Sequence, residues 1–159
     1  MSGFVAGGPS PGGQTSPDGH INTSPFWPSI DLDALRGTLR LDNSITAPRL
    51  ETAVIAAAIS VNRELAAWRI EKQAAGYSKL EDVPGETVED VSEQIHLYRR
   101  AIEAATGAEV CERYRSYDTT NSGGKKADDI EPNIDDYRRD LRWAIRDFLG
   151  IKRTTVELI

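Results

Sequence analysis

The chain has 159 residues and a formal net charge of −6 at pH 7, with 25 acidic and 19 basic side chains. This length allows one domain with a core of its own, and the acidic balance argues against general binding along a nucleic-acid backbone. A single cysteine, Cys111, excludes an intrachain disulfide. The longest nearly apolar run, 53–61, is much shorter than the ~20 residues that a membrane-spanning helix needs, so we expect a soluble protein.

The N-terminal 25 residues are rich in glycine, proline and serine and carry almost no charge. Such a segment cannot bury enough apolar surface to offset the entropy lost on ordering. We therefore expect a flexible arm over 1–25, a helical domain over 26–150 and a short, β-prone tail over 151–159. Phe26 and Trp27 stand where the arm meets the domain, and we expect them to pack as a lid on the core.

Two helices are predicted in the first half of the domain, a short one over 31–41 and a long one over 48–75. Thr46 is the expected N-cap of the long helix, Pro48 is tolerated in its first turn, and Gly76 is expected to end it.

The long helix has two apolar faces, whereas a surface helix of a globular protein has one. The first face carries Leu50, Val54, Ala57, Val61, Leu65 and Trp68; the opposite face carries Ile55, Ile59, Ala66 and Ile70. Two explanations stay open. Either this helix runs through the centre of the domain, or another subunit covers its second face.

A third helix is predicted over 88–117 and a fourth over 130–149, which gives a small all-α bundle of about four helices. We expect the fourth helix to begin at an Asp128 or Asp129 cap and to end at Gly150. The segment between them, 118–128, contains the sequence GGKK. It lacks the preceding strand and the Ser or Thr after the lysine that a phosphate-binding P-loop requires, so we interpret it as an interhelical loop.

The charges of the fourth helix are sorted by sign. A basic strip carries Arg138, Arg139, Arg142 and Arg146; an acidic strip beside it carries Asp136, Asp140 and Asp147; Trp143 lies between the two. This pattern fits a solvated helix with local ion pairs such as Asp135 with Arg139. It also fits a head-to-tail contact between subunits with Trp143 as the buried anchor, or an arginine strip that faces DNA phosphates.

Signals for catalysis are weak. His20 falls in the arm and His96 inside the third helix, and neither has a nucleophile at a telling spacing. Acidic residues gather between 81 and 93, but a helix N-terminus favours such residues without a metal. We predict no enzyme activity, no catalytic residue, no cofactor and no metal site.

Four segments resemble the head completion protein (gpL) family of contractile-tailed, temperate phages. They are FWPSIDLDALRGTLRLDNSITAPRL (26–50), WRIEKQAAGYSKLEDVP (68–84), ERYRSYD (112–118) and KKADDIEPNIDDYRRDLRWAIRD (125–147). Together they span most of the domain, and the combination of ERYRSYD, KKADDI and RRDLRWA is specific. The arm before Pro25 lies outside the resemblance.

The resemblance implies an all-helical head-tail connector, or adaptor, in the virion. Its copies would form a homo-oligomeric ring on the portal, dodecameric to match it, stabilise the DNA-filled capsid and offer a docking surface to the next neck or tail-terminator protein. Packaged DNA would pass through or abut the ring, and no membrane would be involved. Before assembly the subunit would reside in the host cytoplasm.

Candidate interface residues follow from the helix faces and the tail. They are Arg138, Arg139, Arg142, Trp143, Arg146, Asp136, Asp140, Asp147, Ile55, Ile59, Ile70, Val156, Leu158 and Ile159. The last three could add a strand to a partner's sheet. The alternative function is a helical nucleic-acid-binding module that uses the arginine strip.

Overall fold

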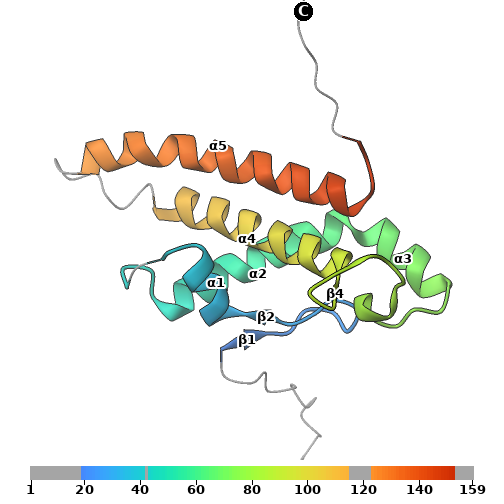
Figure 1. Cartoon of the computed structure of the whole chain (residues 1–159). Coiled ribbons are helices and arrows are strands. Elements are labelled where there is room, and N and C mark those ends of the chain that lie inside the picture. The colour runs from blue at the N-terminus through green and yellow to red at the C-terminus, as the bar shows by residue number, and fades with distance from the viewer. Residues whose placement is uncertain (1–18, 42, 115–122, 153–159) are drawn as a thin grey trace, which may run out of the picture.

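The computed structural model of the protein describes residues 19–41, 43–114 and 123–152, without the side chains of 114 and 123–133. Within this part of the chain five α-helices alternate with short connections, and two small antiparallel strand pairs complete the structure (Figure 1). The prediction of a mainly helical fold is confirmed.

Part of the segment expected to be the arm, residues 19–25, is described by the structure and includes a strand. Strand β1 (His20–Ile21) pairs antiparallel with β2 (Ile30–Asp31), with Ile21 opposite Ile30. Helix α1 (Leu32–Thr38) follows at once. Asp31 caps it, because its Oδ1 accepts hydrogen bonds from the backbone N–H of Asp33 at 2.9 Å and of Ala34 at 3.0 Å.

The predicted long helix is two helices, α2 (Ala47–Glu64) and α3 (Ala66–Ala74), with a one-residue break at Leu65. The N-cap at Thr46, the proline in the first turn and the stop at Gly76, whose φ is 100°, agree with the sequence prediction. Leu65, the residue at this break, is fully buried. The prediction of a single helix over 48–75 was therefore wrong at this point, because tertiary context overrides local helix preference.

The prediction that the third helix begins at residue 88 was wrong as well. After the short 3-10 helix η1 (Leu80–Asp82), strands β3 (Thr87–Val88) and β4 (Val91–Ser92) form a hairpin. Its turn residues Glu89 and Asp90 have φ values of 51° and 61°, as a tight hairpin turn requires. Helix α4 (Glu93–Tyr114) begins only after this hairpin.

Helix α5 (Gly123–Phe148) begins seven residues before the predicted start at 130. The GGKKAD stretch is therefore helical from Gly123 onward, and neither Asp128 nor Asp129 is the cap. The glycines and Pro132 suggested a later start, but such local preferences are a weak guide against tertiary context. The predicted end is confirmed, because Gly150 has a φ of 67°.

Helix α4 is the centre of the bundle, since α2 and α5 both pack on it (Figure 1). Helices α4 and α5 approach closely at Gly107: a Cβ atom there would lie 2.6 Å from the ring of Tyr137. A side chain at residue 107 would therefore require the Tyr137 ring or α5 to move.

An aromatic cluster joins the start of the domain to α3, to the beginning of α4 and to the end of α5. The ring of Trp27 stacks on Tyr98 of α4, with centroids 4.7 Å apart and planes within 2°. Trp68 of α3 meets Phe148 of α5 edge to face at 4.7 Å. Phe26 and Trp27 are almost completely buried, which confirms that they pack on the core.

Candidate interaction surfaces

The second apolar face of the predicted long helix is exposed to solvent. Ile55, Ile59 and Ile70 have exposed fractions of 43 %, 54 % and 59 %. On the opposite side of α2 the side chains are buried against the bundle: Leu50, Ala53, Val54, Ala57, Ala58 and Val61. The explanation that this helix runs through the centre of the domain was therefore wrong for the part of the chain that the structure describes, because the described neighbours cover one side only.

The charged surface of α5 is held largely by ion pairs within the chain. Arg139 contacts Asp136 at 2.7 Å and Asp140 at 3.5 Å. Arg138 pairs with Glu112 of α4 and lies 3.9 Å from Asp135. The pairing is thus not the predicted one of Asp135 with Arg139, and Glu112, which the sequence analysis missed, comes from a different helix. A charge on a neighbouring helix face could have been found only with the helix pairing in hand.

Two further members of the strips are also engaged inside the molecule. Asp147 pairs with Arg100 of α4 at 3.5 Å, and Arg146 donates a hydrogen bond to the backbone carbonyl of Lys152. Both side chains are half-buried. The Asp147–Arg100 pair therefore helps to hold the end of α5 on α4, whereas the Arg146 bond holds the residues that follow α5 against that helix.

Trp143 and Arg142 lie on the outer side of α5, where Arg142 is exposed and Trp143 is half-buried. The guanidinium of Arg139 stacks 4.9 Å from the centre of the half-buried Trp143 ring. Arg142 is exposed and makes no ion pair with another described residue. The three remaining candidates, Val156, Leu158 and Ile159, lie outside the described residues.

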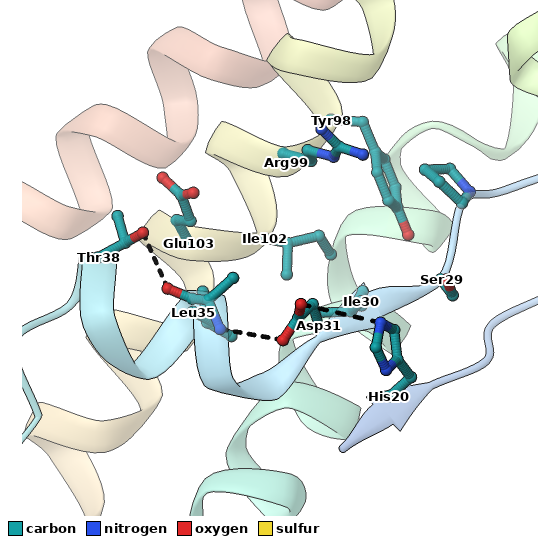
Figure 2. A pocket seen from close by; sticks show the side chains of 12 residues that line it. His20, Ser29, Ile30, Asp31, Leu35, Thr38, Tyr98, Arg99, Ile102 and Glu103 are labelled. Atoms are coloured by element: carbon teal, nitrogen blue, oxygen red, sulfur yellow. Dashed lines mark hydrogen bonds and ion pairs between the residues drawn. The ribbon is translucent and has the colours of Figure 1, made fainter. Parts of the chain in front are cut away.

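A hollow of about 430 Å³ lies between β1, β2, α1 and α4 (Figure 2). His20 Nε2 approaches Asp31 Oδ2 at 3.8 Å, and Glu103 extends from α4 on the far side. The backbone N–H of Ala34, which donates to this carboxylate, lowers the pKa of Asp31, whereas burial raises the pKa of Glu103. The carboxylate of Asp31 is engaged as the N-cap of α1, so its place in the wall of the hollow has a structural explanation.

The acidic segment between 81 and 93 includes most of η1 and the β3–β4 hairpin. Within the described residues no three His, Cys, Asp or Glu side chains come together as metal ligands would. His96, also considered in the sequence analysis, places a ring nitrogen 3.0 Å from the carbonyl of Val88 and so ties α4 to the hairpin. Among the described helices, none is long and apolar enough to cross a membrane.

Comparison with known proteins bears on these surfaces. Residues 21–159 match the family described as phage head completion protein (GPL). The chain is also 37 % identical over 139 residues to the head completion/stabilization protein of Escherichia phage P2, an alignment that covers 87 % of this chain and 82 % of that relative. No solved structure matches it. Because both similarities extend over most of the chain, the protein belongs to the family of phage head completion proteins.

Proposed function

We propose that the protein completes and stabilises the DNA-filled phage head, as a structural subunit of the virion at the head–tail junction. The observation that carries this proposal is the family match over residues 21–159, together with the relative from phage P2, which is named for head completion and stabilization. In this role the chain acts through its surfaces and not as an enzyme. It is made in the host cytoplasm and joins the virion during assembly.

The finer proposal is a homo-oligomeric ring on the portal, with a docking surface for the next neck or tail component. A closed ring needs two different surfaces on every subunit, so that one surface meets the other around the circle. Helices α2 and α5 pack on α4, and each has an outer face turned away from it (Figure 1). Ile55, Ile59 and Ile70 supply an apolar surface on α2 and α3, and Trp143 with Arg142 supplies a mixed one on α5.

The nucleic-acid alternative is not favoured by these contacts. Salt-dependent binding to a duplex depends on basic side chains that can each replace a counterion at a phosphate. Arg138 and Arg139 are already paired with carboxylates, and Arg146 is half-buried against the chain. Such a strip offers few free charges on a protein whose net charge is −6.

The proposal is tested by mixing the purified protein with the portal ring of its own phage and imaging the product by electron microscopy. We expect a second ring stacked on the portal, and we expect Trp143→Ala to reduce ring formation while the helix content by circular dichroism stays unchanged. Lys79→Glu, a change of an exposed residue that belongs to neither set, is the control. If no complex forms at micromolar concentration, even with DNA-filled heads, the connector role is wrong.

A further inference from the structure

Four exposed residues of α2 form a line along the outer surface of the helix. Glu51, Ile55, Ile59 and Arg63 are spaced four residues apart, and all four are exposed. Residues at this spacing form one of the ridges by which helices pack. We call this line the outer ridge; it reads acidic, apolar, apolar, basic.

The two charges of the outer ridge are not used by ion pairs within the described part of the chain. Neither Glu51 nor Arg63 makes an ion pair with another residue in the described ranges, and at 1.5 Å per residue they stand about 18 Å apart along the axis. They therefore cannot satisfy each other inside one molecule. The two isoleucines between them are about half exposed, at 43 % and 54 %.

We propose that the free protein pairs with a second copy of itself through the outer ridge, in an antiparallel, two-fold arrangement centred near Ala57. In this register Ile55 of one copy meets Ile59 of the other, and the reverse contact forms by symmetry. Glu51 lies at the same level as Arg63 of the second copy, again twice. The ridge is thus complementary to itself when it is reversed, as an isologous contact requires.

The geometry of helix packing supports this register. In the commonest packing class, with a crossing angle of about −50°, the ridges of four-residue spacing on the two helices run parallel to each other. The ridge of one copy then lies along the reversed ridge of the other, apolar against apolar and acid against base. A parallel pair would instead set Glu51 against Glu51 and Arg63 against Arg63, and this repulsion selects the antiparallel form.

The pair and the ring are different states of the chain. Neighbours in a ring are related by rotation about the ring axis, whereas the proposed pair has its own two-fold axis between antiparallel helices. The pair would cover the apolar part of α2 before assembly, and the portal-bound state would have to separate it. This last step rests on the proposed function; the pairing itself does not.

The experiment is sedimentation equilibrium on the full chain and on charge-reversed variants. Glu51→Arg sets Arg against Arg in both contacts, and Arg63→Glu sets Glu against Glu. We expect each change to weaken dimerisation by about tenfold or more, because two attractions become two repulsions. The double variant restores both pairs and should dimerise like the wild type. An equimolar mixture of the two single variants should form a heterodimer, although each variant alone dimerises weakly.

Glu64→Arg is the matched control, since Glu64 is exposed on α2 but lies outside the ridge, on a different side of the helix. It should leave the dimer unchanged, and thermal melts should show that every variant folds. The proposal is overturned if the wild type is monomeric up to millimolar concentration. It is equally overturned if a dimer forms that ignores Glu51→Arg and Arg63→Glu, because another face would then hold it. If the wild type is monomeric and the ridge variants fail to stabilise heads, then the ridge binds a different head protein instead of a second copy.

Discussion

Tyr98 illustrates how one side chain of α4 serves both packing and hydrogen bonding. Its ring lies on Trp27, and its hydroxyl donates to Asn62 Oδ1 of α2 at 2.9 Å. Burial raises the pKa of Tyr98 from 10.0 to about 12. The folded protein therefore holds the phenol proton more tightly than the unfolded chain does.

The consequence is a loss of stability in alkali. In the unfolded chain Tyr98 ionises near pH 10, so its contribution is complete below that pH and is lost as pH rises toward 12. We expect Tyr98→Phe to cost about 1 kcal/mol at neutral pH through the lost hydrogen bond. The variant should also lose less stability than the wild type between pH 10 and 12. Urea denaturation across this range checks it, and parallel pH profiles of the two proteins would contradict the assignment.

Individual residues differ in how well the sequence predicted them. The burial of Phe26 and Trp27 was predicted correctly, because two large apolar side chains at the start of a domain are stabilised most by packing on its core. Glu89 and Asp90 were missed because tight hairpin turns usually carry Asn or Gly, and nothing in two acidic residues indicates a left-handed backbone.

Among the elements, the contact of α4 with α5 depends on the absence of a side chain at Gly107. A Cβ atom there would lie 2.6–2.7 Å from three ring carbons of Tyr137, so α5 or the ring must move to admit it. This contact lies midway along the bundle, between the aromatic cluster and the Arg138–Glu112 pair.

We therefore expect Gly107→Ala to destabilise the protein by about 1–3 kcal/mol, as overpacking of a core does. Gly37→Ala in α1 is the control, because a Cβ atom there meets nothing within 4 Å. In a helix that change should leave stability equal or raise it by up to about 1 kcal/mol. The comparison is made by thermal denaturation. An equal effect of both substitutions would mean that α5 does not press on Gly107.

The bounds of the helices were predictable where a stop signal stands alone, as at Gly76 and Gly150. They were not predictable at Leu65, where α2 gives way to α3, because a buried leucine carries no mark of a break. The burial of one face of α2 could be read from its apolar spacing. Whether its second face was covered could not, because spacing shows that a face is apolar and not what lies on it.

At the scale of the whole molecule, the strand pair at the start of the domain closes the bundle. Ile21 of β1 packs at the edge of the core, and the carbonyl of Gly19 accepts a hydrogen bond from the N–H of Leu32 at 2.8 Å. These contacts belong to residues that the sequence analysis had assigned to the arm.

Two truncated chains test whether strand β1 stabilises the bundle. A chain that starts at Gly19 keeps every contact of β1 described above, whereas one that starts at Pro25 loses the strand pair and the apolar packing of Ile21. We expect the shorter chain to lose about 1–2 kcal/mol relative to the longer one, roughly 3–8 °C in melting temperature. Equal melting temperatures would show that β1 adds nothing to the bundle and that the boundary near residue 25 is the physical one.

The three tryptophans of the chain occupy two kinds of environment. Trp27 and Trp68 lie in the aromatic cluster, while Trp143 is half-buried on the outer side of α5 beside Arg139. The tryptophan fluorescence lost in a Trp143→Phe chain is therefore that of the outer surface of α5. The fluorescence that remains is that of Trp27 and Trp68 in the interior. The protein thus carries a built-in optical probe: quenching of the first signal by iodide tracks whether α5 is covered during assembly, independently of whether the fold is intact.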